Sequence, residues 1–174
     1  MDVFVVIKGS AAIALSNPKS PSNVGAVMRA AGCYGAHAIY YTGERFERAA
    51  KFHQDTNNIS STIELTGVES FVSQKKPEQK LVCIELVEGA TPLPEFKHPE
   101  DALYVFGPED GSIDQAVVDA ADAVVFIPTI GCMNLAATVN VLLYDRMAKQ
   151  HQQGDQTELI RNSRDVNNRL AIKR

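Results

Sequence analysis

Five short apolar runs, most of them separated by enough residues for a helix, constrain the fold of this chain most strongly. They are rich in Val, Ile, Tyr and Phe, and most are apolar on both faces instead of alternating with polar residues. Strands of that kind are typical of a parallel sheet covered on both faces. The runs lie at residues 3–7, 38–41, 81–86, 103–106 and 123–127. They predict an α/β, doubly wound fold.

Segments that favour helices fill most of the intervals between these strands. They lie at residues 23–33, 67–73, 114–121 and 134–150. Residues 44–66 are polar, and we expect a helical turn there, then a loop and a short strand near residues 61–65. Prolines at positions 92, 94 and 99 predict an irregular link before the strand that begins at residue 103.

The composition indicates one soluble globular domain without a metal. The chain has 174 residues, of which 45% are hydrophobic and 22% are charged. No apolar run is long enough to span a membrane and no cleavable signal is evident, so we expect a cytoplasmic protein. Three cysteines without CxxC spacing and four scattered histidines argue against a disulfide framework and a metal site.

The charge pattern leaves RNA binding open. The net charge of −4 does not by itself indicate a nucleic-acid-binding protein. The end of the chain is nevertheless basic, and such a segment either contacts phosphates or forms a solvated tail. Its cationic residues are Arg161, Arg164, Arg169, Lys173 and Arg174.

A Pro-, Ser- and Asn-rich loop runs into the helix predicted at residues 23–33. Ser22 is a candidate N-cap, and the amides that follow it suit an anion. Gly25 and Arg29 are four residues apart and share a helix face. The glycine permits close approach, and Arg29 offers a planar guanidinium beside it. The alternative is a capped surface helix with a solvated arginine.

Glycines, an acid and amides follow three of the predicted strands. In open α/β sheets, ligands bind at the carboxyl ends of strands. The segments 87–89, 107–112 and 128–135 therefore suit a small ligand held largely by backbone groups. Neither a GxGxxG loop nor a Walker GxxxxGK[ST] loop occurs, which disfavours dinucleotide-binding and P-loop proteins.

Three segments carry a family resemblance. The first reads Asn23-Val-Gly and then Arg29-Ala-Ala, the second Phe-Gly107-Pro-Glu109, and the third Ile127-Pro, a short loop and Asn-Leu opening a helix. Taken in order, they resemble the SpoU/TrmH family of the SPOUT superfamily. Its members are S-adenosylmethionine-dependent RNA methyltransferases that mostly modify the ribose 2′-hydroxyl. The agreement in order and spacing covers residues 3–150.

The resemblance implies a parallel-sheet SPOUT fold with a C-terminal deep trefoil knot. It places the methyltransferase domain at residues 1–152, with the knot at about 81–150, and leaves 153–174 as a basic tail. It also implies a homodimer, in which the first motif of one chain completes the site of the other, and a tRNA or rRNA substrate. The residues expected to hold S-adenosylmethionine are Glu85, Leu86, Gly107, Ile127, Cys132 and Leu135.

The catalytic residues implied by the resemblance are Arg29, Asn23, Glu109 and Asn134. Arg29 would handle the hydroxyl and an adjacent phosphate, as a base in a desolvated site or by stabilising the developing alkoxide. Both asparagines also suit helix N-caps. Glu109 would hold Arg29 or a neighbouring amide in place, or it is a solvated loop acid.

Two departures from the family pattern keep other functions open. Gly111 comes one residue early in the second motif, and in the third motif Cys132 and Ala136 stand where relatives often have serine. Cys132 has no paired histidine in the motif, so it is better read as a small packing residue than as a nucleophile. One alternative is a catalytically silent knotted protein that binds RNA or cofactor. The other is a SPOUT methyltransferase that acts on a base nitrogen.

Overall fold

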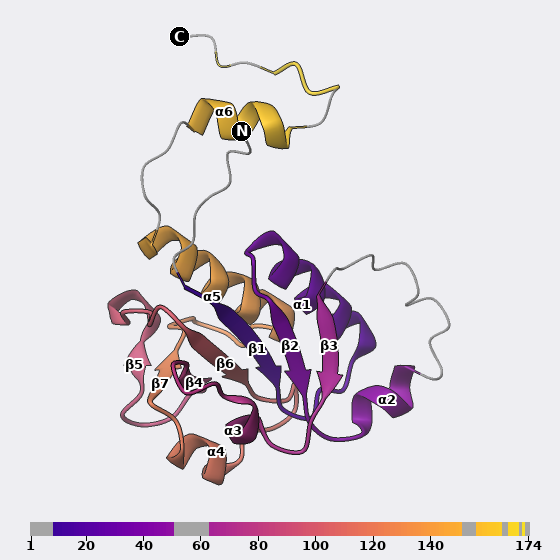
Figure 1. Cartoon of the computed structure of the whole chain (residues 1–174), viewed down its shortest axis with the longest axis vertical. Coiled ribbons are helices and arrows are strands. Elements are labelled where there is room, and N and C mark those ends of the chain that lie inside the picture. The colour runs from indigo at the N-terminus through magenta and orange to yellow at the C-terminus, as the bar shows by residue number, and fades with distance from the viewer. Residues whose placement is uncertain (1–8, 51–62, 151–155, 165–166, 171, 173–174) are drawn as a thin grey trace.

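A parallel β-sheet forms the centre of the protein (Figure 1). The computed structural model describes residues 9–50, 63–150, 156–164, 167–170 and 172. Its strands are β1 (Ala11–Leu15), β2 (Ala38–Tyr41), β3 (Glu64–Gly67), β4 (Lys80–Ile84), β5 (Thr91–Pro92), β6 (Ala102–Phe106) and β7 (Ala123–Phe126). Within the described ranges, these strands pair in the order β3-β2-β1-β6-β4-β7-β5, and every pair is parallel.

Helices cover both faces of this sheet. In the described residues the helices are α1 (Pro21–Cys33), α2 (Arg45–Ala50), α3 (Phe71–Gln74), α4 (Gln115–Asp119), α5 (Leu135–Gln150) and α6 (Gln156–Ser163), with a 3₁₀ turn, η2 (Leu93–Glu95), before β6. Helices α1 and α5 lie together on one face (Figure 1). In the described part of the chain, every helix is too short or too polar to cross a bilayer.

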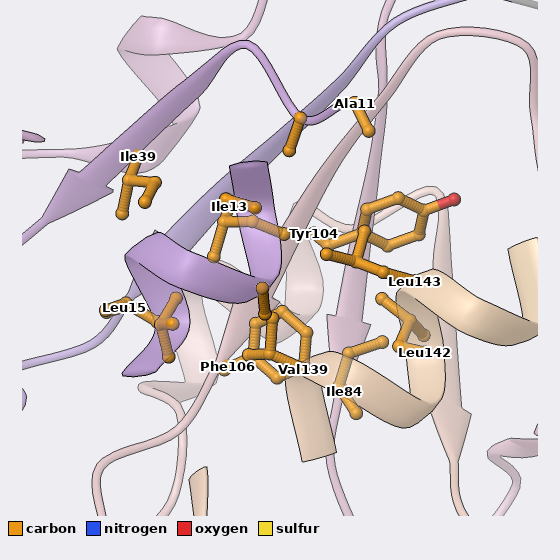
Figure 2. Packing of buried hydrophobic residues seen from close by; sticks show 14 of the residues in the cluster. Ala11, Ile13, Leu15, Ile39, Ile84, Tyr104, Phe106, Val139, Leu142 and Leu143 are labelled. Carbon is orange, nitrogen blue, oxygen red and sulfur yellow. The ribbon is translucent and has the colours of Figure 1, made fainter. Parts of the chain in front are cut away.

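Alternation along the central strands builds two apolar layers. Ile13 and Leu15 of β1 pack with Tyr104 and Phe106 of β6 and with α1 and α5, as Figure 2 shows. The intervening residues of both strands face the opposite layer, which includes Phe71 of α3. The strands are therefore buried on both faces, as their continuous apolar sequences predict.

A buried polar network fastens the second half of α5 to the amino end of the sheet. Arg146 is only 2% exposed, and it donates to the carbonyl oxygens of Pro99 and Glu100 and to the Tyr104 hydroxyl at 2.6, 2.5 and 3.0 Å. His98 lies between the Tyr104 hydroxyl, at 2.8 Å, and the Asp145 carboxylate, at 2.9 Å. Burial lowers the pKa of His98, so the imidazole is neutral at pH 7.

The predicted parallel α/β architecture is confirmed, although one central strand escaped prediction. Strand β1 reads Ala-Ala-Ile-Ala-Leu, and alanine is depleted in strands. The strand predicted at residues 3–7 lies outside the described residues. The link predicted to be irregular contains β5 and η2, and α6 forms within the predicted basic tail.

The helix start predicted at Ser22 is wrong by two residues. Ser20 is the N-cap of α1, and its side chain accepts a hydrogen bond from the Asn23 N–H at 3.4 Å. Pro21 then occupies the first helical position, where its fixed φ is favourable and its missing N–H costs nothing. Asn23 therefore lies in the first turn of α1 and does not precede the helix.

Candidate functional site

The carboxyl ends of β1 and β6 meet where the strand order changes direction. Strands β2 and β3 continue to one side of β1, and β6, β4 and β7 lie on the other. Just beyond the two strands, the Ser16 N–H donates to the Phe106 carbonyl oxygen at 2.9 Å. Open α/β sheets bind ligands at such a switch point.

Glu109 joins the loop after β6 to the start of α1. Its Oε2 accepts from the backbone N–H of Lys19 at 2.9 Å. Its Oε1 accepts from the backbone N–H of Ser20 at 3.1 Å and from Asn23 Nδ2 at 3.0 Å. One carboxylate thereby connects the loop before α1 to the loop after β6, which lie about 90 residues apart in the sequence.

The electrostatics of Glu109 favour a positioning role. Partial burial would by itself raise its pKa, but the hydrogen bonds from Asn23 and from the two backbone N–H groups outweigh burial and lower the pKa. The carboxylate is therefore ionised at neutral pH, and both of its oxygens are engaged. A general base would need a free oxygen in reach of the substrate hydroxyl.

Arg45 of α2 contacts the same loop, although no sequence motif marks this residue. Arg45 Nη1 donates to Asp110 Oδ1 at 2.8 Å, and Arg45 Nη2 lies 3.8 Å from Glu109 Oε2. Lys19 Nζ lies 3.6 Å from Asp110 Oδ2. Arg45 belongs to the polar stretch 44–66, which contains no recognisable motif, so only the fold brings it to the site.

A cavity of about 150 Å³ lies beside Glu109 at the ends of β4 and β6. Three of the predicted cofactor residues, Glu85, Gly107 and Leu135, line it. Leu86, Ile127 and Cys132 are not among its lining residues, and Leu86 is 75% exposed. Their role in cofactor binding stays a prediction. The rest of the lining comes from Ile84, Phe106, Pro108, Glu109, Gly111, Met133 and Thr138.

Pro108, Gly111 and Met133 lie in the segments 107–112 and 128–135 that suit a ligand by sequence, whereas Ile84, Phe106 and Thr138 lie outside them. Gly111 and Pro108 belong to the second motif, and Ile84 and Phe106 end the buried strands β4 and β6. Their position at a strand end was a usable signal. Thr138 carried no such signal, because only the packing of α5 brings it to the cavity.

Glu85 shapes the wall of this cavity. Its Oε2 accepts from the backbone N–H of Ile113 at 2.9 Å, and its Oε1 accepts from the N–H of Leu86 at 3.0 Å. A Cβ added at Gly107 would lie 3.2 Å from Glu85 Oε2 and 3.5 Å from the Ile113 nitrogen. Glycine at position 107 therefore leaves room for the loop to close on the carboxylate.

Asn134 is an N-cap for α5 in this structure. Its Oδ1 accepts from the Ala137 N–H at 2.7 Å, and its carbonyl oxygen accepts from the Thr138 hydroxyl at 2.9 Å. The residue is exposed, and its Nδ2 makes no hydrogen bond with the described residues. Capping uses the amide oxygen and leaves the amide donor available for a ligand.

Arg29 stands apart from Asn23 and Glu109. It is exposed on α1, whose residues Val24 and Val27 are buried against the sheet. Within the described residues it makes no hydrogen bond or ion pair, and it does not line the cavity. The structure therefore brings Asn23 and Glu109 together and leaves the guanidinium of Arg29 unengaged in a single chain.

Comparisons with known proteins identify relatives of this chain. A 23S rRNA (guanosine-2′-O-)-methyltransferase RlmB from Nitrosomonas europaea is 25% identical over 149 residues, covering 81% of this chain and 56% of the relative. A tRNA (cytidine(34)-2′-O)-methyltransferase from Beijerinckia indica is 26% identical over 123 residues, covering 67% of this chain and 75% of the relative. The chain thus spans little more than half the length of the first relative.

A solved structure shows the same fold. An rRNA methyltransferase from Sinorhizobium meliloti superposes with a TM-score of 0.66 at 19% identity, covering 84% of this chain and 58% of that chain. The family model described as "SpoU rRNA Methylase family" matches residues 10–144, which include the strand-end loops, Glu109 and Arg29. The chain therefore belongs to the SpoU rRNA methylase family.

Proposed function

We propose that this protein transfers a methyl group from S-adenosylmethionine to a ribose 2′-hydroxyl of tRNA or rRNA. The observation that carries the proposal is the Glu109–Asn23 contact, which joins two family motifs beside the strand-end cavity. Both curated relatives are named as RNA 2′-O-methyltransferases. RNA substrates support a cytoplasmic place of action.

The cavity suits S-adenosylmethionine in chemistry. Ile84, Phe106 and Leu135 offer apolar contact, and Gly107 allows close approach to the backbone. When bound, the cofactor supplies an electrophilic methyl group on its sulfonium. We propose that the six predicted residues hold it, with Leu86, Ile127 and Cys132 closing over it from the loops after β4 and β7.

The chain's own residues would orient the hydroxyl and stabilise its charge. The hydroxyl would lose its proton to solvent, so negative charge would develop on its oxygen until that oxygen bonds to the methyl carbon, while the carbon–sulfur bond breaks and leaves a neutral thioether. Arg29 would stabilise that charge, because a preorganised donor counts most where charge develops. Glu109 fixes Asn23 and the loop before α1, and Asn134 presents its amide donor.

We also propose the finer architecture that the resemblance implies. The methyltransferase domain would span residues 1–152, with the trefoil knot at about 81–150, and residues 153–174 would form a basic tail. Family membership supports the knot. In the tail, Arg161, Arg164 and Arg169 are exposed, which leaves them free for phosphates.

A homodimer would complete the site, since Arg29 does not reach the cavity of its own chain. Apolar positions on α5 from Leu135 to Leu143 suggest an interface in the sequence, yet Leu135, Val139, Leu142 and Leu143 are buried in the chain's own core. The exposed large apolar residues of α5 are Val141 and Tyr144, at 38% and 57% exposure.

We expect light scattering at micromolar concentration to give twice the 19.0 kDa chain mass. Replacing Tyr144 with Glu should shift the population toward monomer, because a buried interface disfavours an unpaired charge. A wild-type protein that is monomeric under these conditions would contradict the dimer.

Replacing Gly107 with Val tests the cofactor site. The added side chain meets Glu85 and Ile113, so we expect S-adenosylmethionine affinity to fall at least about tenfold, or about 1.4 kcal/mol. Gly32→Val is the matched control, because a Cβ there meets only Ile63, at 3.9 Å. Calorimetry measures the cofactor affinity of both variants. An affinity of Gly107→Val equal to that of the wild type would mean that the cofactor does not bind in this cavity.

Incorporation of labelled methyl from S-adenosylmethionine into RNA tests the function as a whole. We expect incorporation into tRNA or rRNA by the wild type and much less by Gly107→Val. RNA and cofactor binding without any methyl transfer would favour the catalytically silent alternative, to which the Cys132 and Ala136 departures point.

A further inference from the structure

An open groove lies next to the candidate site on the side of α2. It has a volume of about 330 Å³ and is lined by Lys19, Arg45, Arg48 and Ala49. Lys19 comes from the loop after β1, and the other three come from α2. Three cationic side chains from two separate segments therefore converge on one surface, in a chain whose net charge is −4.

Each of these cations is held by a carboxylate in the RNA-free protein. Lys19 and Arg45 share Asp110, at 3.6 and 2.8 Å, and Arg48 pairs with Glu44 one turn earlier in the chain. Hydrogen bonding from Arg45, together with the nearby charges, lowers the pKa of Asp110. With Glu109, which lies 3.8 Å from Arg45, three carboxylates offset the three cations, so the groove does not act as a long-range basic patch.

These cations nevertheless retain hydrogen-bonding capacity that their carboxylate partners do not satisfy. Nε and Nη2 of Arg45 are buried, and neither has a hydrogen-bond acceptor among the described residues. The side chains of Lys19 and Arg48 are 66% and 74% exposed. Exposed ion pairs contribute only about 0–1 kcal/mol, so a stronger acceptor can displace their carboxylates. Arginine's planar fork fits a phosphate with two hydrogen bonds.

The groove is continuous with the candidate site through two neighbouring residues. Glu109 lines the cavity and lies 3.8 Å from Arg45, and Asp110 is the next residue in the same loop. A phosphate bound in the groove would therefore lie within one loop of the place where the substrate hydroxyl is proposed to react. That arrangement suits a backbone phosphate close to the target nucleotide.

We propose that Lys19, Arg45 and Arg48 form a contact surface for an RNA backbone phosphate, and that binding shifts Arg45 from Asp110 to the phosphate. This inference rests on the proposed function. It specifies that the RNA backbone passes the candidate site on the side of α2. Asp110 and Glu44 act as internal competitors. Together with Glu109, they keep the charge of the surface close to zero until a phosphate reaches it.

The test measures RNA affinity of the full chain over a series of salt concentrations, with labelled unfractionated tRNA and fragmented rRNA as probes. Lys19→Ala and Arg48→Ala should each weaken binding about 3- to 10-fold and reduce the slope of log affinity against log salt by about 0.7–0.9. Lys80→Ala is the matched control, because Lys80 is an exposed, ion-paired cation at the amino end of β4.

Asp110→Asn tests whether Asp110 competes with an RNA phosphate for Arg45 and Lys19 or is needed to hold these side chains in place. The substitution removes the charge that holds Arg45 and Lys19, so the proposal predicts RNA affinity at least twofold above wild type. A loss of affinity in Asp110→Asn, or unchanged slopes in Lys19→Ala and Arg48→Ala, would overturn the proposal. If the wild type methylates RNA and these variants bind RNA with wild-type affinity, the groove is not an RNA contact, and the proposed function is unaffected. A wild type that binds neither RNA probe would overturn both.

Discussion

Replacing Arg29 with Ala should lower methyl transfer by about 10²–10³-fold, the effect expected when one preorganised contact to developing charge is lost. Arg29 is exposed on α1, and nothing in the described parts of its own chain engages it. A guanidinium left free in this way would be available to a substrate oxygen in the dimeric site that we propose. Single-turnover methylation of RNA at saturating cofactor measures the loss.

Two companion measurements separate catalysis from folding and from binding. Arg29→Lys should restore little activity, because an ammonium lacks the planar fork of the guanidinium. Cofactor affinity should be unchanged in both variants, since Arg29 does not line the cavity. Transfer by Arg29→Ala within about threefold of wild type would contradict the role, because that factor is less than about 1 kcal/mol of barrier.

Replacing Arg146 with Ala should lower the free energy of unfolding by about 3–5 kcal/mol. The substitution removes the donors to Pro99, Glu100 and Tyr104 and leaves a cavity where the largest fully buried side chain had been. Buried acceptors without donors are costly, and the residual cavity adds to that cost. Urea unfolding followed by circular dichroism measures the loss.

Arg146→Met separates the contribution of the lost hydrogen bonds to stability from that of the lost side-chain volume. Methionine fills much of the space but donates nothing, so we expect it to recover only part of the lost stability. The exposed Arg48→Ala is the matched control and should change stability by less than about 0.5 kcal/mol. A loss below about 1 kcal/mol in Arg146→Ala would mean that the network does not anchor α5.

The architecture was predictable because most strands are continuously apolar and most helices lie in the intervals between them. Strand β1 escaped because three of its five residues are alanine, and only its position between β2 and β6 makes it a strand. The helix start was misplaced because Ser20 and Ser22 are equally good caps in the sequence. Pro21 decides between them, since it favours the first helical position.

The candidate site was predictable where a motif marks it and not where folding alone assembles it. Glu109 and Asn23 were both singled out from the sequence, yet their hydrogen bond depends on β1 lying beside β6. Arg45 and Arg146 belong to a polar stretch and to a long helix, where charged residues are ordinarily solvated. Their contacts arise from tertiary packing, which no local pattern encodes.

The position of the transferred methyl group distinguishes methylation of the ribose from methylation of a base. RNA is incubated with the protein and with S-adenosylmethionine that carries a deuterated methyl group, then digested to nucleosides and fragmented in a mass spectrometer. We expect the deuterated methyl on the ribose, with the signal reduced about 10²–10³-fold in Arg29→Ala. Label on a base, or no label in either tRNA or rRNA, would contradict it.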